Sequence, residues 1–455
     1  MSLTQKISTY WQNNPILRRI SRNFGYLFSS NMLAAGLGML QGIFSARLLG
    51  VPGLGLLGTI TIFVTVINKL TSFRMGELVI KYVGEFHEKK DSQRAAALFK
   101  AAALTELVAS VLAFGLTWLL APLGARYFAK DTSLTNWFVL YGVIILANLI
   151  AESSTGLLQF FDRFRRMAGL NILQSLVTLA LTILAWWQKT GLQGVLLAYL
   201  VGKAISAVGL TIAALIEASR RWGKSWWKTP LSLLKEQASQ LVKFAISTNL
   251  SSSLSLISRD SGILWVSYFS TPTQAGYYKL AMSLANYIQM PVAPMPQATY
   301  PELSRAVARR KWDDFRTVIR QGTWIAGGYA TLVAIFLVLL GKALIQILYT
   351  PAFLPTYPGL VIMLVGIVVG SAWYWSRSAL LSFGLADYAT WVNLLVTVLS
   401  VAGMVSLLPR YGFLGSAVVY TAGALLGNSI VVLKSRKELR RQQELFPSER
   451  EGVPE

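Results

Sequence analysis

The dominant pattern along the chain is a series of long apolar segments separated by short polar connections. A bilayer core of about 30 Å takes about 20 helical residues to cross, and most segments reach that length. About twelve such segments lie near residues 24–46, 54–78, 101–123, 136–161, 168–187, 192–216, 244–269, 275–298, 322–341, 359–383, 388–408 and 413–433. The fifth and the eighth are the weakest, and the prolines of MPVAPMPQATYP predict that the eighth kinks or breaks. The pattern predicts an all-α integral membrane protein.

The positive charge is concentrated in alternate connections, for example around Arg163 and Arg221. The opposite set holds only Arg47, Arg126, Lys130, Lys189, Lys342 and Arg410. This roughly five-fold bias predicts that the basic connections, and both termini, are cytoplasmic. The 455 residues are 54% hydrophobic and 14% charged, with a net charge of +22. Topology accounts for most of that charge. Anionic lipid head groups at the cytoplasmic face are compatible with it, and nucleic-acid binding is not indicated.

A repeat predicts how the chain divides. Residues 50–95 and 271–316 each combine a proline, a glycine, an apolar span and a basic loop, at an offset of about 220 residues. Such a repeat predicts two parallel six-helix lobes around a central cleft. The expected parts are a cytoplasmic N-terminal segment (1–22), an N-terminal lobe (23–216), a cytoplasmic interfacial linker (217–243), a C-terminal lobe (244–434) and a cytoplasmic tail (435–455). The linker is expected to hold an amphipathic helix, and the tail to fray from Glu438.

Two adjacent charges, Arg259 and Asp260, interrupt the span 244–269. Arg259 lies about 22 Å along the helix from Phe244, close to mid-membrane, where a charge costs about 2.5–3.5 kcal/mol. Side chains of adjacent helical residues point about 100° apart, so one can face a cleft while the other points into its lobe. Arg259 is a candidate phosphate ligand because its planar fork donates two parallel hydrogen bonds. The alternative is a purely structural ion pair.

The other ionisable residues of the spans are few. Lys69 and Glu152 lie deep. Near the cytoplasmic end of the second span, four charged residues spaced three or four apart form either a self-neutralising ladder or a cytoplasmic gate: Arg74, Glu77, Lys81 and Glu85. Lys203, near the middle of its span, either pairs with a carboxylate such as Glu152 or faces the cleft. Glu106, Lys279 and Arg377 lie near span ends, where long side chains can reach the interface.

Uncharged polar residues on the expected cleft helices suit a wet pathway for a hydroxyl-rich substrate. They are Asn31, Gln41, Asn68, Asn249, Asn286 and Gln289. The chain has no cysteine and a single histidine, His87, which excludes thiolate and His-cluster metal sites. We therefore expect no metal, no cofactor and no catalytic residue. The short connections leave no room for a catalytic domain, so the chain is not expected to be an enzyme.

Four stretches occur in a characteristic order. They are ARLLGVPGLGLLG at Ala46–Gly58, SRDSGILWVSYFSTPTQAGYYKLA at Ser258–Ala281, LYTPAFLPTYP at Leu348–Pro358 and YGFLGSAVVYTAG at Tyr411–Gly423. Together they resemble the Wzx-type bacterial polysaccharide flippases (O-antigen or exopolysaccharide) of the multidrug/oligosaccharidyl-lipid/polysaccharide exporter, or MOP, superfamily. Asp260 matches the usual aspartate of that family, and Gly276-Tyr277 its usual glycine-tyrosine. The resemblance covers nearly the whole chain, although many members have two further helices.

The resemblance implies a MATE-like fold that rocks between inward-open and outward-open states. Its implied substrate is an undecaprenyl-diphosphate-linked oligosaccharide, and its implied location is the bacterial cytoplasmic membrane. Lys69 and Arg259 would lie near the diphosphate, with Arg74 at the entrance. Coupling to protons or sodium would need a carboxylate, for which Asp260, Glu77 and Glu152 are the candidates. Membrane lipids and polysaccharide polymerase or export proteins are the other implied partners.

Three other classes of membrane protein compete with this interpretation. A multidrug exporter of the same superfamily would favour an acidic or apolar cavity, which the deep Arg and Lys residues oppose. A membrane glycosyltransferase or polymerase would need catalytic groups in its external connections, and those here, such as KTGLQG, are short. A major facilitator is disfavoured because the connection VGEFHEKKDSQRAAALFK lacks that family's usual motif.

Overall fold

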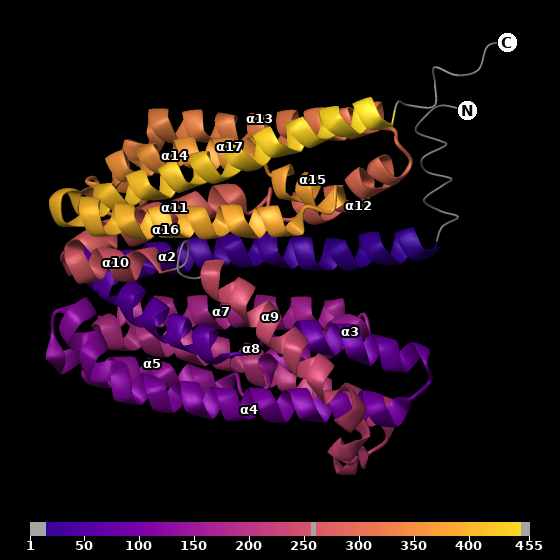
Figure 1. Cartoon of the computed structure of the whole chain (residues 1–455). Helices are drawn as coiled ribbons and strands as arrows, with labels where there is room; N and C mark the ends of the chain where they lie inside the picture. The colour runs from indigo at the N-terminus through magenta and orange to yellow at the C-terminus, as the bar shows by residue number, and fades with distance from the viewer. Residues whose placement is uncertain (1–14, 256–260, 447–455) are drawn as a thin grey trace. The chain divides into compact units, whose positions relative to one another are not determined.

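A computed structural model describes residues 15–255 and 261–446, and every regular element in those ranges is a helix (Figure 1). The elements of the first half are α2 (Pro15–Thr71), α3 (Met75–Glu88), α4 (Ser92–Leu123), η1 (Gly124–Ala129), η2 (Thr132–Leu134), α5 (Thr135–Ala147), α6 (Ala151–Phe160), α7 (Phe164–Trp187) and α8 (Gly191–Trp222). After η3 (Trp226–Lys228) and η4 (Leu231–Gln237), the second half contains α9 (Ala238–Ser255), α10 (Gly262–Phe269), α11 (Pro272–Gln289), α12 (Met295–Ala308), α13 (Trp312–Leu344), η6 (Ile345–Tyr349), η7 (Pro351–Phe353), α14 (Thr356–Ala372), α15 (Ser376–Ser382), α16 (Ala386–Tyr411) and α17 (Phe413–Leu445).

Within the described ranges, nine helical stretches are long and apolar enough to cross a membrane. The first, Phe28–Glu88, contains the first two predicted segments, and Gly50 separates them with a φ of 64°. Glycine adopts positive φ at no steric cost, so this position sets the turn between the two. The fifth predicted span, one of the two weakest, is confirmed as Phe164–Trp187.

Two predicted spans are not among these nine. The span 244–269 includes residues outside the described ranges. The span 275–298 breaks as predicted, because α11 ends at Gln289 and α12 begins at Met295, with Pro291 and Pro294 between them. Proline lacks the N–H that would continue the helical ladder. The predicted all-α membrane fold is confirmed.

The predicted repeat is visible in the irregular parts of the helices. The third long helix of each half, α4 or α13, ends in a π-helical turn (η1 or η6) followed by a 3-10 turn (η2 or η7). A second feature is shared: two helices of each half are interrupted at matching places. The interruptions follow Thr71 and Ala147 in the first half, and Gln289 and Ala372 in the second. π-turns and breaks of this kind are costly, so their recurrence points to a duplicated architecture.

By its contacts the chain forms two compact units. Of the described residues, 15–45, 67–121 and 135–250 form unit 1, and 46–66, 122–134, 251–255 and 261–446 form unit 2. Two segments of the first half therefore pack with the second half. The contact units thus differ from the predicted lobes 23–216 and 244–434, which follow the chain alone.

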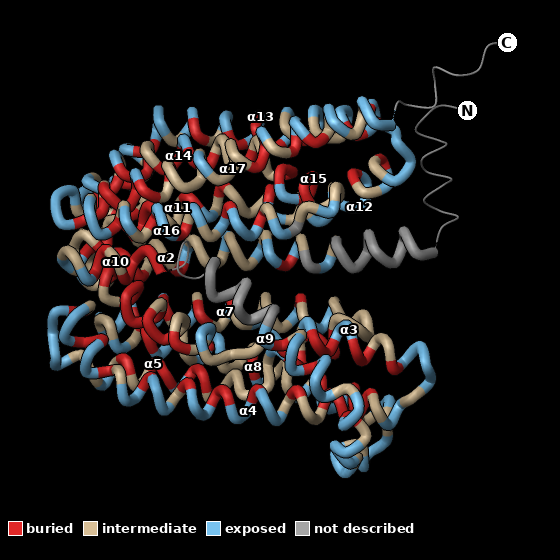
Figure 2. Tube along the Cα trace, in the orientation of Figure 1, coloured by how far each residue is buried: buried red, intermediate tan, exposed pale blue. Residues whose placement is uncertain are grey.

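The core of unit 1 is built on a stripe of α3. Leu78, Tyr82 and Phe86 recur at a helical spacing of four, are buried, and pack with Phe99 of α4. A smaller core in unit 2 surrounds Phe315 of α13. The helices α4 and α13 both carry many exposed positions (Figure 2). Large apolar side chains occupy several of them, such as Trp118, Leu119, Trp324 and Leu339. Apolar helix faces of this kind fit contact with lipid.

The structures of two polar segments, the linker and the tail, differ from the sequence predictions. Gly223–Gln237, inside the predicted linker, forms two short 3-10 turns rather than an amphipathic α-helix. The tail does not fray at Glu438, because α17 continues to Leu445. Leu439 packs beside the Phe315 cluster, and the Trp312 indole N–H donates to the Phe446 carbonyl at 2.9 Å.

Candidate functional site

Two helix breaks lie together in unit 1. The chain is non-helical at Ser72–Arg74, between α2 and α3, and again between α5 and α6. The two restarting helices touch backbone to backbone at Gly76 and Gly156. A Cβ on Gly156 would lie 2.5 Å from the Gly76 carbonyl oxygen, so only glycine permits this approach. Discontinuous helices of this kind expose backbone dipoles inside a bundle and often mark transport sites.

Glu106 of α4 caps the second break. Its carboxylate accepts hydrogen bonds from the Glu152 N–H at 2.7 Å, the Ser153 N–H at 2.9 Å and the Ser153 hydroxyl at 2.6 Å. The first N–H groups of a helix have no partner within it, and an anion there also complements the helix dipole. The expectation that Glu106 reaches an interface is wrong, because the residue is 4% exposed.

Charged side chains predicted separately meet around this pair of breaks. Arg74 and Glu77 form an ion pair of 2.6 Å, as the ladder interpretation predicted, and both side chains stay half exposed. The Glu152 carboxylate lies within electrostatic reach of Arg74, Glu77 and Lys69. We call Lys69, Arg74, Glu77, Glu106 and Glu152 the charge cluster. It combines two cations, which suit phosphate, with three carboxylates, which can gain or lose protons.

Sequence reasoning missed Glu106 as a member of this cluster. Its distance from the end of an apolar segment suggested the interface, but the break at Asn148–Ile150 brings unpaired N–H groups to it instead. The available signal was the polar run Glu152–Thr155 within the predicted span 136–161. The Lys203 ammonium lies over the Tyr141 ring, 5.9 Å from its centroid, and both interpretations weighed for it stay predictions.

The predicted polar lining divides into two kinds. Gln41 is buried and donates to the Ser175 carbonyl of α7 at 2.7 Å, and Asn31 accepts from the Asn171 amide at 3.1 Å. Both therefore contact α7 within unit 1. Gln289 donates to the Tyr420 hydroxyl at 2.9 Å, and Asn286 is exposed.

The remaining predicted residues give less structural information. Asn68, half buried, ends α2 with its carbonyl accepting from the Ser72 N–H at 2.8 Å. Arg259 and Asp260 lie outside the described residues, as does the side chain of Asn249. Their predicted roles stay predictions.

Within unit 2, the first-half segment 46–66 packs closely on α10 and α11. A Cβ on Gly55 would lie 2.0 Å from the Pro272 carbonyl oxygen, and one on Gly276 would lie 2.0 Å from the Val51 carbonyl oxygen. The hydroxyls of Thr59 and Ser267 are 2.7 Å apart. We call this contact the outer contact, because its segments border the connections that are poor in Lys and Arg.

Comparison with solved structures shows which fold the chain has. A multidrug resistance MATE family transporter of the MOP superfamily, in an inward-facing conformation, matches with a TM-score of 0.77 at 14% identity, covering 91% of this chain and 96% of that chain. The lipid II flippase MurJ, in an inward closed conformation, matches with a TM-score of 0.70 at 14% identity, covering 92% of this chain and 90% of that chain. The chain therefore has the fold of the MOP-superfamily transporters.

Sequence comparison then gives the family. The model of the family described as "Polysaccharide biosynthesis protein" matches residues 20–307, and the chain belongs to that family. The inner membrane protein YghQ of Escherichia coli (strain K12) is 23% identical over 350 residues, which cover 76% of this chain and 97% of that protein. The family that the sequence resemblance indicated is confirmed by this match, which spans the first two of the four stretches, and the fold is that of MOP-superfamily transporters.

Proposed function

We propose that this chain is a flippase, which moves an undecaprenyl-diphosphate-linked oligosaccharide from the cytoplasmic to the outer leaflet for cell-surface polysaccharide biosynthesis. The observation that carries the proposal is a charge cluster on paired helix breaks in a chain of the polysaccharide biosynthesis family. The name of MurJ, a lipid II flippase with the same fold, supports a lipid-linked substrate. The name of YghQ supports the cytoplasmic membrane as the location, with both termini cytoplasmic by the Lys and Arg bias.

The basic residues of the cluster are proposed to bind the diphosphate. Lys69 and Arg74 supply the described positive charges, and Arg259 is proposed to join them. Charge-assisted hydrogen bonds to phosphate are about twice as strong as neutral ones, and the low dielectric of a membrane protein interior strengthens them further. The glycan would pass the polar residues of the first, second, seventh and eighth predicted spans while the lipid tail stays in the bilayer.

The carboxylates are proposed to couple transport to protons or sodium. Glu77 and Glu152 stand beside the proposed phosphate ligands, so a cation bound there would change the local charge that the diphosphate meets. Asp260 is the third candidate. The outer contact is proposed to be the closed external gate, which must open for release of the substrate.

Flipping by the purified protein in liposomes tests the function. A fluorescent undecaprenyl-diphosphate oligosaccharide is placed in both leaflets, and an external quencher reports movement to the outside. Active protein is expected to make nearly all of the label accessible, against about half without protein. Efflux of cationic dyes with no lipid movement would instead support a multidrug exporter, and lengthening of the glycan would support an enzyme.

A disulfide tests the external gate. The chain has no native cysteine, so Thr59→Cys with Ser267→Cys adds the only pair, at positions whose oxygens are 2.7 Å apart. A disulfide needs Cβ atoms about 3.5–4.5 Å apart, which this contact allows. Oxidation is expected to abolish flipping and a reductant to restore it, while each single cysteine variant stays active. Full flipping by the oxidised pair would refute the gate.

A further inference from the structure

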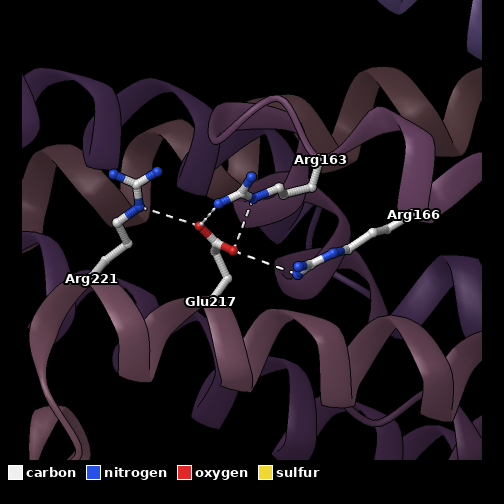
Figure 3. A network of polar contacts seen from close by, with 4 residues as sticks. All are labelled: Arg163, Arg166, Glu217 and Arg221. Atoms are coloured by element: carbon white, nitrogen blue, oxygen red, sulfur yellow. Dashed lines mark hydrogen bonds and ion pairs between the residues drawn. The ribbon is translucent and has the colours of Figure 1, made fainter.

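Three arginines converge on one carboxylate where α7 begins and α8 ends (Figure 3). Arg163 donates to both oxygens of Glu217, from Nε at 2.9 Å and from Nη2 at 2.7 Å. Arg221 donates from Nε at 3.2 Å, and Arg166 is the most distant, with Nη1 3.6 Å away. We call these four residues the arginine triad and its glutamate. They lie in unit 1 and outside the charge cluster.

The charges of this group do not balance. The Glu217 side chain is fully buried, whereas the side chains of Arg163, Arg166 and Arg221 are 34%, 41% and 46% exposed. A guanidinium has about five N–H donors, and Glu217 accepts two hydrogen bonds from Arg163 and one from Arg221, while Arg166 is only within ion-pair distance. The hydrogen bond to Glu217 also raises the pKa of Arg163, so that residue stays cationic. Three converging cations with one anion favour a second anion on the exposed side.

The surface beside the triad is built like a membrane interface. Ile212, Ile216 and Arg220 are exposed and lie one turn apart along α8, so an apolar stripe leads directly to a cation. The Trp222 and Phe161 rings pack on each other, 6.2 Å between centroids, and Arg221 lies 4.8 Å from the Phe161 centroid. Tryptophan beside basic residues at a helix end is typical of the head-group level of a bilayer.

The position of the arginine triad in the membrane indicates which kind of anion it binds. By the Lys and Arg bias these helix ends face the cytoplasm, where anionic lipids are enriched and each basic residue near the surface attracts them. Basic pockets between transmembrane helices on that side are known sites for lipid head groups. A lipid also fits the apolar stripe, which a soluble phosphate would leave unused.

We propose that Arg163, Arg166 and Arg221 bind the head-group phosphate of an anionic phospholipid of the cytoplasmic leaflet. Its acyl chains lie along Ile212 and Ile216, and Arg220 lies at the rim. Glu217 is the positioning residue: from its buried place it holds the three guanidiniums together so that their outer N–H groups face the phosphate. The lipid is a resident ligand and is not the transported molecule, so the inference is independent of the proposed function.

The test measures lipid binding to the purified full-length chain in neutral detergent. Phosphatidylglycerol is added, with phosphatidylcholine of the same chains as the neutral lipid, and binding is followed by native mass spectrometry and by the unfolding temperature. We expect phosphatidylglycerol alone to be retained and to raise the unfolding temperature. Arg166→Gln is the main variant, because Arg166 is the weakest contact of Glu217 and the other two arginines still neutralise the carboxylate.

Arg316→Gln is the matched control, since Arg316 is also exposed on the basic side and lies 3.7 Å from an acid, Asp313. Arg166→Gln is expected to weaken phosphatidylglycerol binding about ten-fold, which corresponds to one charge-assisted hydrogen bond, and Arg316→Gln to leave it unchanged. Equal binding of phosphatidylcholine, an equal loss in both variants, or full binding by Arg166→Gln overturns the proposal. Displacement of the lipid by millimolar inorganic phosphate also overturns it, in favour of a free-anion site.

Discussion

The helix breaks of the two halves have the same architecture and different chemistry. In the first half the breaks are held by charges: Glu106 caps α6, and Arg74 pairs with Glu77. In the second half the corresponding ties come from uncharged groups. They are the Ser378 hydroxyl to the Pro296 carbonyl at 3.3 Å, the Trp375 indole to the Thr323 hydroxyl at 2.7 Å and the Ser376 hydroxyl to the Asn428 amide oxygen at 3.5 Å.

This difference separates what the fold needs from what the function needs. Uncharged groups are sufficient to hold such a break together, as α12 and α15 do in unit 2. Charges in a membrane interior cost several kcal/mol unless they are paired, so a fold that can be held without them does not require them. The charges of the first half are therefore the better candidates for transport chemistry, with Glu106 serving both purposes.

The largest expected effect follows from removing the cations of the charged break. Lys69→Ala with Arg74→Ala is expected to reduce flipping about 100-fold, since each charge-assisted hydrogen bond to phosphate contributes about 1.5–3 kcal/mol. The initial rate in liposomes, at matched amounts of folded protein, measures the effect. Arg377→Ala is the control, because Arg377 is exposed on α15 at the neutral break. Equal losses in both would show that the two breaks do not differ in function.

The sequence predicted the membrane spans, the proline break after Gln289 and the repeat because these depend on local composition. It also predicted Lys69, Arg74, Glu77 and Glu152 as exceptions to that composition. The sequence did not predict that these four residues lie close together, because their proximity depends on where the helices α2 and α5 are interrupted. Neither Ser72–Arg74 nor Asn148–Ile150 contains a proline, and the interruptions are stabilised by the contact of Gly76 with Gly156 and by Glu106, which are far apart in sequence.

The next effect concerns stability. Glu106→Ala removes the acceptor of three hydrogen bonds and leaves buried donors of α6 unpaired, at a cost of about 3 kcal/mol. Thr323→Val, the counterpart at the neutral break, leaves only the Trp375 indole unpaired and is expected to cost about 1 kcal/mol. Unfolding temperatures in the same detergent compare the two. A smaller loss for Glu106→Ala than for Thr323→Val would mean that the charged cap is not needed for the fold.

The smallest effect tests the backbone contact that the charged break requires. In Gly156→Ala the new Cβ would lie 2.5 Å from the Gly76 carbonyl oxygen, which is backbone and has no rotamer with which to move away. Overpacking of this kind costs about 1–3 kcal/mol. Gly370→Ala, on α14 one turn before the neutral break, meets nothing closer than the Asn428 amide nitrogen at 3.7 Å. Alanine is the better helix former by about 1 kcal/mol, so this variant is expected to be unchanged or slightly stabilised.

Opposite shifts in unfolding temperature for Gly156→Ala and Gly370→Ala would show that the first-half break depends on close helix approach while the second does not. Shifts of the same sign would place the difference between the two breaks in their charges alone.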